Sequence, residues 1–293
     1  MEVKLIKSTS VNATSSEYTD WNSIKSIHEK NITGREIKVA ILDTGCEINH
    51  PLMNSAKIYG KNFTNEGNED VIYDFNGHGT HVAGIIAGSH FNGVYGIAPN
   101  VELLICKVLN KDGVGHCEWI CDAIEYAIDQ GVDIINMSLG MKMDDTNLYQ
   151  VINKAIDKDI LVVCASGNSG DGKANTDECD YPGCYEEVIC VGAVDNQYNV
   201  SRFSNSNKYV DIVAPGENII STYLDSSVKA MTGTSMATPY VSGCLALIKE
   251  WSTKEFGRKL SEIELYGELI KNTKTLKCER TLQGHGLLLL KCN

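Results

Sequence analysis

The sequence has no excess of positive charge, no long apolar run and little proline. Its 293 residues contain 26 Lys and Arg against 38 Asp and Glu, a formal net charge of −12. This balance argues against a nucleic-acid partner, because such proteins gather basic residues to neutralise phosphates. No apolar run approaches the roughly 18–20 residues of a membrane-spanning helix, and the start, MEVKLIKSTS, lacks the features of a secretory signal. We therefore expect a cytoplasmic protein without a membrane partner.

Proline and cysteine usage narrows the class further. Only 5 Pro with 43% hydrophobic residues excludes a disordered or low-complexity chain. The 11 Cys are odd in number and irregularly spaced, and a chain of this length buries enough surface without cross-links. We therefore expect free thiols in a reducing compartment. No linker, charge block or repeat divides the chain, so we expect a single domain over residues 1–293.

Short apolar runs alternate with helical patterns. Runs of this kind predict strands buried on both faces at residues 36–42, 101–108, 132–137, 160–165 and 188–194. Helical spacing of apolar residues predicts helices at residues 119–128, 148–156 and 236–251. This alternation predicts an α/β protein with a mostly parallel central sheet and helices on both faces.

Polar residues at the carboxyl ends of such strands are the first candidates for a site, because the loops leaving those ends form the binding crevice. Asp43 follows the first predicted strand, His78 lies in NGHGTHVAG and Ser235 lies in GTSMATP, the last two at the starts of helices. A serine hydroxyl is a poor nucleophile and needs a base and a third group that orients the base. These residues supply one of each, although each alone usually has a structural explanation.

In the order Asp, His, Ser, and inside Asp-Thr-Gly, His-Gly-Thr-His and Gly-Thr-Ser-Met-Ala, the chain resembles the subtilisin family of serine proteases. The likeness extends from residue 3 to about residue 290, through KNFT, VDIINMSLG, LVVCASGNSGDG, YPGCYEEVICVGAV and VAPGENIIST. The branch that it most resembles is the intracellular subtilisins of Gram-positive bacteria. The resemblance implies a three-layer fold and a serine endopeptidase that acts on polypeptides and needs no cofactor for its chemistry.

The resemblance also implies a role for each candidate. Ser235 is the nucleophile, His78 the general base and then acid, and Asp43 the residue that orients the imidazole. Asn168 matches the family's side-chain donor to the oxyanion, beside the unpaired amides at the helix start that holds Ser235. The intracellular branch further suggests a homodimer.

By the same resemblance, an extended substrate lies between two edge segments. The first contains Gly113 and Gly115, and the second consists of Ser138, Leu139 and Gly140. Glycines in both segments also suit ordinary turns. Cys117 and Ile120 would border a more distant subsite.

The primary pocket implied by the resemblance has the segment at Ser138 as one wall and Ala165, Gly167 and Asn168 as the other. Its floor is Asp180, where the family usually has a small residue. A carboxylate in a partly desolvated pocket should pair with a cation, so we expect cleavage after Lys or Arg. The alternative is that Asp180 turns into solvent with its acidic neighbours Asp177 and Glu178.

The resemblance does not settle whether the protein binds a metal ion or how its activity is controlled. Leu52 and His90 replace two oxygen donors of the family's tight calcium site, so we expect that site to be lost. A weaker position for calcium or another structural cation would use the backbone carbonyls of Gly183, Tyr185 and Val188. The chain is expected to begin almost at the mature boundary, without the short inhibitory extension of the intracellular branch.

Three other hypotheses compete. A zinc enzyme would use His78 and His81, or the pairs Cys117/Cys121 and Cys179/Cys184, but the spacing is wrong for His-Glu-x-x-His and no third ligand is evident. A non-catalytic peptide-binding protein would share the fold, although all four chemical positions are present. A dedicated leader-peptide processing peptidase would share the chemistry and differ in substrate range.

Overall fold

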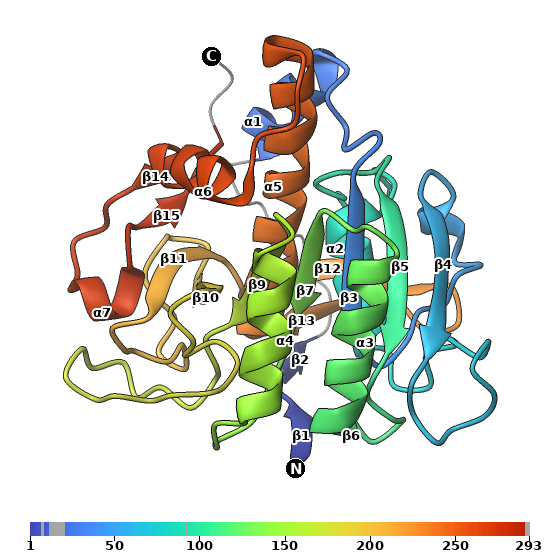
Figure 1. Ribbon diagram of the computed structural model, residues 1–293. Coiled ribbons are helices and arrows are strands. Elements are labelled where there is room, and N and C mark those ends of the chain that lie inside the picture. Colours follow the sequence, from blue (N-terminus) through green and yellow to red (C-terminus); the bar gives the residue numbers. More distant parts are fainter. Residues whose placement is uncertain (7–8, 12–20, 92, 291–293) are drawn as a thin grey trace.

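The computed structural model describes residues 1–6, 9–11, 21–91 and 93–290, and a nine-stranded sheet runs through its centre (Figure 1). In chain order its strands are β3 (Lys38–Asp43), β4 (Lys57–Asn62), β5 (Glu102–Lys107), β7 (Ile134–Met137), β9 (Leu161–Ala165), β10 (Ile189–Val194), β11 (Val210–Pro215), β14 (Thr273–Lys274) and β15 (Leu287–Leu288). They lie side by side in the order β14-β15-β11-β10-β9-β7-β3-β5-β4. Every neighbouring pair is parallel except β14 with β15.

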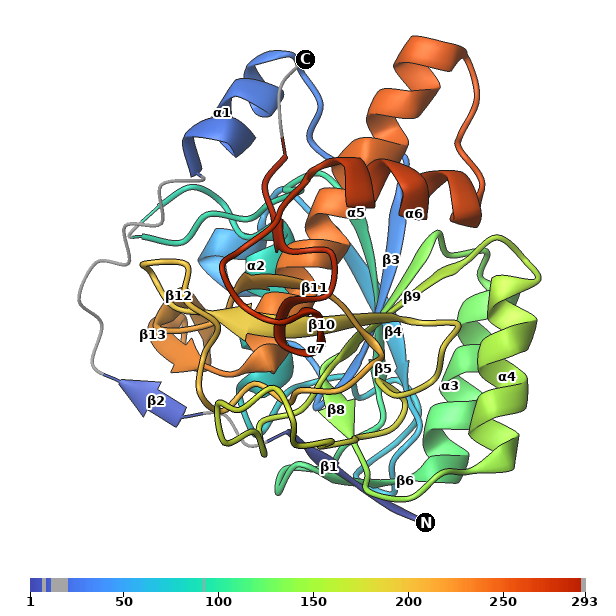
Figure 2. The same cartoon turned by 90° about the vertical axis from the view of Figure 1, so that its left-hand side faces the viewer.

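Helices cover both faces of this sheet. They are α1 (Trp21–Glu29), α2 (His78–Ala87), α3 (Cys117–Asp129), α4 (Thr146–Ile156), α5 (Thr234–Phe256), α6 (Glu262–Lys271) and α7 (Arg280–Gln283), with a short 3₁₀ helix at Pro51–Met53. Figure 2 shows α3 and α4 on one side of the strands and α2 on the other. Buried side chains of α2 and α5 form one core with the sheet, and those of α3 and α4 form a second. The predicted α/β fold with helices on both faces is confirmed.

The sequence pattern accounts for these helices. In α3 the buried residues recur every three or four positions, at Cys117, Ile120, Ala123, Ile124 and Ala127, as expected of a helix that packs one face on a sheet. By contrast, α5 is buried on all sides over its first seventeen residues, because it packs against both the sheet and α2. Within the described ranges, no helix is long and apolar enough to cross a membrane.

Two small antiparallel sheets accompany the large one. The first joins β1 (Glu2–Leu5), β6 (Val114–His116) and β8 (Leu139–Gly140), and the second joins β2 (Thr9–Val11), β12 (Ile219–Tyr223) and β13 (Ser227–Thr232). These strands are short, and β1 and β2 pair with segments more than a hundred residues away. The sequence analysis did not predict them.

The register of the large sheet gathers several strand ends at one edge. Asp43, the last residue of β3, lies opposite Lys107, the last residue of β5. On the other side of β3, Leu42 lies opposite Met137 at the end of β7. Since the strands are parallel, the loops that follow β3, β7 and β9 leave from this same edge. Of the candidate catalytic residues, Asp43 ends β3 and Asn168 lies in the loop after β9, while His78 and Ser235 lie at the starts of α2 and α5.

Candidate active site

Asp43 and His78 form a buried pair. Nδ1 of His78 lies 2.8 Å from Oδ1 and 3.0 Å from Oδ2 of Asp43, and both side chains are at most 1% exposed. Oδ1 also accepts a hydrogen bond from the backbone N–H of Thr44 at 2.7 Å. A ring held in this way carries its proton on Nδ1 and presents Nε2 as an acceptor. The structure brings together the acid and base that the sequence analysis paired.

The second ring nitrogen of His78 has no hydrogen-bond partner among the described residues, although it is buried. Ser235, the second residue of α5, directs its hydroxyl to the backbone carbonyl of Ser138 at 3.2 Å. Ser138 returns a hydrogen bond from its own hydroxyl to the carbonyl of Ser235 at 2.9 Å. The start of α5 is therefore tied to the segment after β7, a contact that the sequence analysis did not find.

Asn168 is fixed beside Ser235 by its neighbour Thr234. Its Oδ1 accepts from both the backbone N–H and the hydroxyl of Thr234, each at 2.9 Å. Because a backbone N–H can only donate, the atom that faces it must be the oxygen, and Nδ2 is directed to the opposite side of the amide. The backbone N–H groups in the first turn of α5 also lack partners within the helix. The Asn168 amide is therefore tied to the first turn of α5, the turn that holds Ser235.

The turn that leads into His78 is held by Asp74. Oδ1 of Asp74 accepts from the N–H groups of Asn76 and Gly77, and Oδ2 accepts from the backbone N–H and hydroxyl of Thr80, all within 2.9 Å. Gly77 has φ 99°, a left-handed conformation that favours glycine. The signal for this clamp is the Asp-Phe-Asn-Gly turn sequence, which the sequence analysis passed over.

A buried lysine lies beside the Asp43 strand end. Lys107 is fully buried, and its ammonium donates to the carbonyls of Thr44 at 2.7 Å and Leu109 at 3.2 Å, with a Glu66 carboxylate oxygen at 3.4 Å. It therefore fixes the backbone that follows Asp43. The sequence analysis included Lys107 in a predicted strand without assigning it a structural role.

His81 faces away from this pair. Its Nε2 lies 3.0 Å from the carbonyl oxygens of both Ile219 and Lys229, to which it donates. Burial lowers the pKa of His81 to about 3, so the ring is neutral at physiological pH. In the part of the chain that the structure describes, no group of three or more His, Cys, Asp or Glu side chains could hold a metal. The zinc hypothesis therefore has no site there.

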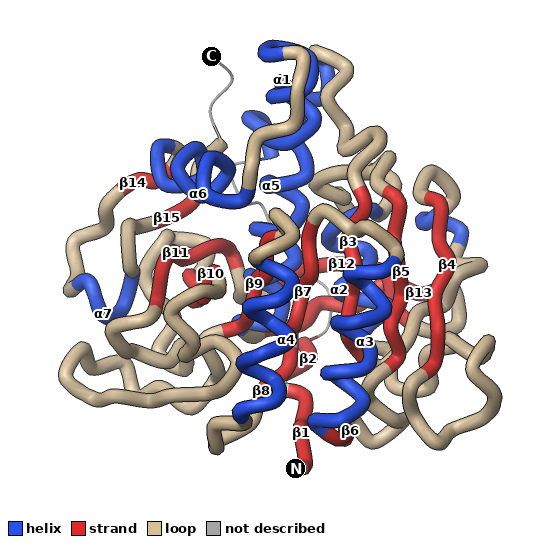
Figure 3. The backbone as a smooth tube through the Cα atoms, viewed as in Figure 1, coloured by secondary structure: helices blue, strands red, loops and turns tan. Residues whose placement is uncertain are grey.

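The two edge segments hold an extended chain. Strand β1 lies between β6 and β8, antiparallel to both, with Val3 opposite Gly115 and Lys4 opposite Gly140 (Figure 3). The N–H of Leu5 donates to the carbonyl of Gly113 at 2.9 Å. The sequence analysis did not place an N-terminal segment in this groove. The sequence analysis missed it because both pairing partners lie more than a hundred residues away.

Side chains of this N-terminal segment fill the groove. Val3 is 1% exposed and joins the core cluster that includes Cys117, Ile120 and Leu139. Further along, Ile6 lies 3.3 Å from the point where a Cβ on Gly140 would be. The cavity here has a volume of about 600 Å³. Its lining includes Ile6, Gly140, Asn168 and Asp180.

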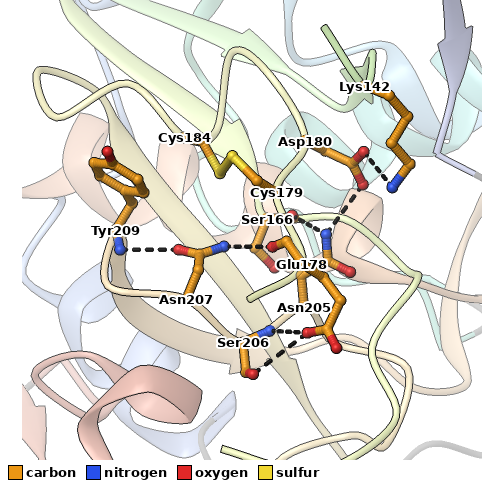
Figure 4. The surroundings of a disulfide bond; sticks show 10 residues. All are labelled: Lys142, Ser166, Glu178, Cys179, Asp180, Cys184, Asn205, Ser206, Asn207 and Tyr209. Atoms are coloured by element: carbon orange, nitrogen blue, oxygen red, sulfur yellow. Dashed lines mark hydrogen bonds and ion pairs between the residues drawn. A yellow bond between two sulfur atoms is a disulfide. The ribbon is translucent and has the colours of Figure 1, made fainter. Parts of the chain in front are cut away.

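Asp180 points into this cavity and not into solvent. The residue is 6% exposed, its Oδ2 accepts from Nδ2 of Asn205 at 3.0 Å, and its Oδ1 lies 2.6 Å from the ammonium of Lys142 (Figure 4). A Cβ on Gly167 would lie 2.2 Å from the Asp180 carboxylate, and Gly167 has φ +111°, so only glycine lets the wall come this close. The outward-facing alternative for Asp180 is wrong, and the sequence analysis did not find Asn205 or Lys142.

A disulfide bond joins two cysteines that flank Asp180 in the sequence. Cys179 and Cys184 are joined, with their Cα atoms 5.8 Å apart, on either side of Asp180 (Figure 4). The expectation that all cysteines are free thiols is therefore wrong at this pair. Free thiols are found at Cys46, Cys106, Cys117, Cys121, Cys164, Cys190, Cys244 and Cys278.

The two residues that replace oxygen donors of the tight calcium site make other contacts. Leu52 packs against the apolar cluster of Val94 and Ile220, and His90 stacks on His28 with ring centroids 5.2 Å apart. Neither side chain offers an oxygen, whereas calcium takes about six to eight oxygen ligands. These residues do not fit calcium.

The carboxylate near the weaker cation position is Asp211, and it is already hydrogen-bonded. Asp211 accepts from a backbone N–H at 2.8 Å and from the hydroxyl of Tyr266 at 2.7 Å, and burial raises its pKa to about 6. A cation there would depend on the backbone carbonyls of Gly183, Tyr185 and Val188. Carbonyls without a carboxylate form a weak site for a hard dication.

The chain is similar in sequence to known serine proteases. A model of the Subtilase family matches residues 34–286. An intracellular serine protease of Paenibacillus polymyxa is 53% identical over 260 residues, which is 88% of this chain and 80% of the relative. The major intracellular serine protease of Bacillus subtilis is 51% identical over 265 residues, covering 89% and 83%. Subtilisin Savinase of Lederbergia lenta is 40% identical over 262 residues, covering 89% and 91%.

Proposed function

This chain belongs to the subtilase family and is a serine endopeptidase, and we propose that Asp43, His78 and Ser235 perform its chemistry. The observation that carries this assignment is the His78 ring, which is hydrogen-bonded to Asp43 through Nδ1 while its buried Nε2 lacks a partner among the described residues. A buried acceptor without a donor is costly in a folded protein. The Ser235 hydroxyl, once it turns to Nε2, donates the proton that satisfies this acceptor.

Rotation about the Cα–Cβ bond of Ser235 moves its hydroxyl from the Ser138 carbonyl to Nε2 of His78. Oγ then attacks the scissile carbonyl carbon while its proton passes to Nε2, and Asp43 stabilises the imidazolium that forms. His78 returns this proton to the leaving amine, and the C–N bond breaks to leave an acyl-enzyme. Water repeats the sequence in the second half, so that the acid product and Ser235 are regenerated.

The negative charge on the substrate oxygen develops next to two sets of amide donors. One is the N–H group of Ser235 in the first turn of α5, and the other is Nδ2 of Asn168. The bonds from Thr234 to Oδ1 support this role, because they fix the orientation of the Asn168 amide before the substrate arrives. Donors that are already oriented stabilise the transition state without reorganising.

The substrate lies extended between β6 and β8, in the position that β1 occupies. Support comes from the pairing of β1 itself, which satisfies backbone groups on both edges and places alternate side chains in the groove. Main-chain pairing of this kind is independent of sequence, as a general endopeptidase requires. It follows that β1 must leave before a polypeptide binds.

Asp180 makes a basic residue before the scissile bond favourable. The carboxylate lies at the cavity that Ile6 enters, and it is buried enough for a cation to gain from reaching it. We further assign the protein to the cell interior, because the Paenibacillus and Bacillus relatives are named intracellular proteases.

The test is Ser235→Ala in a preparation free of host proteases. Peptide hydrolysis should fall by about 10⁶-fold, the scale of the same change in a subtilisin, with the thermal unfolding temperature unchanged. Hydrolysis that survives the substitution would exclude Ser235 as the nucleophile.

A further inference from the structure

The carboxylate of Asp180 already has a cation partner within the chain. Lys142, two residues after β8, places its ammonium 2.6 Å from Oδ1 of Asp180 and donates to the hydroxyl of Ser169 at 3.1 Å. Lys142 belongs to one wall of the cavity and Ser169, next to Asn168, to the other. The lysine side chain therefore bridges the two walls above the carboxylate.

The two members of this ion pair differ in exposure. The Lys142 side chain is 62% exposed and the Asp180 side chain is 8% exposed. A lysine with most of its side chain in water loses little when its ion pair opens, whereas a buried carboxylate that loses a paired cation is strongly destabilised. The pair can therefore open by movement of Lys142 alone, provided that another cation takes its place on Asp180.

The N-terminal segment illustrates the state in which the pair stays closed. The apolar side chain of Ile6 and the Cβ of Asp180 both lie within 3.4 Å of the point where a Cβ on Gly140 would be. An apolar side chain thus shares the cavity with a carboxylate whose charge is balanced by Lys142 and whose second oxygen is held by Asn205. Without Lys142, the same apolar side chain would cover an uncompensated charge.

We propose that Lys142 is a specificity-determining residue that serves as an exchangeable counter-ion for Asp180. With an apolar residue before the scissile bond, Lys142 stays on Asp180 and neutralises it. With Arg or Lys there, the substrate cation takes the place of the ammonium, which moves into solvent. The pocket therefore accepts both classes, and Lys142 restrains the preference for basic residues that Asp180 alone would impose. This proposal rests on the proposed function, because it concerns the substrate pocket of the same endopeptidase.

The experiment compares kcat/KM on two matched peptides that carry Arg or Leu before the scissile bond. Lys142→Met keeps the aliphatic stem and removes the charge, so the Arg/Leu ratio should rise about tenfold, with faster cleavage after Arg and slower cleavage after Leu. In an Asp180→Asn background, Lys142→Met should leave the ratio within about twofold of that background. The fraction of enzyme whose groove is filled by β1 lowers kcat/KM equally for both peptides, because both meet the same population of enzyme. This fraction therefore cancels in the Arg/Leu ratio.

Lys173→Met is the matched control, because Lys173 pairs with Asp171 at 2.9 Å on an exposed loop and does not line the cavity. It should leave the Arg/Leu ratio unchanged. An unchanged or lower ratio in Lys142→Met would overturn the proposal, as would an equal rise in the Asp180→Asn background. Lys142→Gln, also uncharged, repeats the test if the methionine variant has a lowered unfolding temperature. Failure of the proposed function would appear differently, as hydrolysis of both peptides that persists in Ser235→Ala.

Discussion

Strand β1 should lower activity by competing with substrate, and Val3 offers the cleanest way to measure this. Its side chain is 1% exposed in the groove and would lie in water once β1 leaves. Val3→Ala removes two buried methyl groups from the state in which β1 fills the groove. At ~0.8 kcal/mol for each group, and with a small contribution from the cavity left behind, the filled state becomes less stable by about 2 kcal/mol. Since about 1.4 kcal/mol is tenfold, the ratio of open to filled groove should rise about 10–30-fold.

While most molecules have a filled groove, kcat/KM is proportional to the open fraction. Val3→Ala should therefore raise kcat/KM on a short chromogenic peptide by about 10–30-fold, up to the point where the open state dominates. Lys4→Ala is the matched control, because Lys4 is on the same strand but exposed, and it should change kcat/KM less than about threefold. An unchanged or reduced kcat/KM in Val3→Ala would refute the view that β1 competes with substrate, because that view requires a gain.

Three further results are expected. Asn168→Ala should lower kcat by about 10²–10³, the range that loss of this donor costs a subtilisin, with KM little changed, and steady-state kinetics would contradict this if only KM moved. Because the pKa of His81 is about 3 in the folded protein and 6.5 for an unperturbed histidine, its contribution to stability is present above pH 6.5 and lost as the pH falls. In urea unfolding, the loss of stability between pH 7 and pH 5 should be smaller in His81→Gln than in the wild type by about 2 kcal/mol, and an equal loss in the two proteins would disprove the assignment. Calcium at 1 mM should raise the melting temperature by less than about 2 °C relative to magnesium, since Leu52 and His90 offer no oxygen, and a larger rise in calorimetry would reveal a site there.

The sequence predicted the centre of the fold well for a physical reason. Strands such as β3, β7 and β9 are buried on both faces, so their sequences are continuous apolar runs that stand out in the chain. Asp43 could be placed at the end of such a run and therefore at the binding edge of the sheet. The contact with His78 was implied by the resemblance to the subtilisin family and not by that position alone.

Features that depend on pairing between distant segments could not be predicted in this way. Strand β1 alternates Glu2, Val3, Lys4 and Leu5, a pattern of four residues that is too short to separate from chance and that names no partner. The pair Lys142–Asp180 joins two loops whose approach is set by β8 and β9. The disulfide between Cys179 and Cys184 likewise depends on a turn geometry that spacing alone does not define.

The central claim is that His78 activates Ser235 for attack, and covalent labelling tests it most directly. A fluorophosphonate or sulfonyl fluoride reagent, followed by peptide mass spectrometry, should place one adduct on Ser235. Replacing His78 with Ala should slow the labelling rate by at least about 10³-fold, because the hydroxyl loses its base while the helix start that holds it is retained. An adduct on another residue, or labelling of Ser235 at the same rate without His78, would contradict the account.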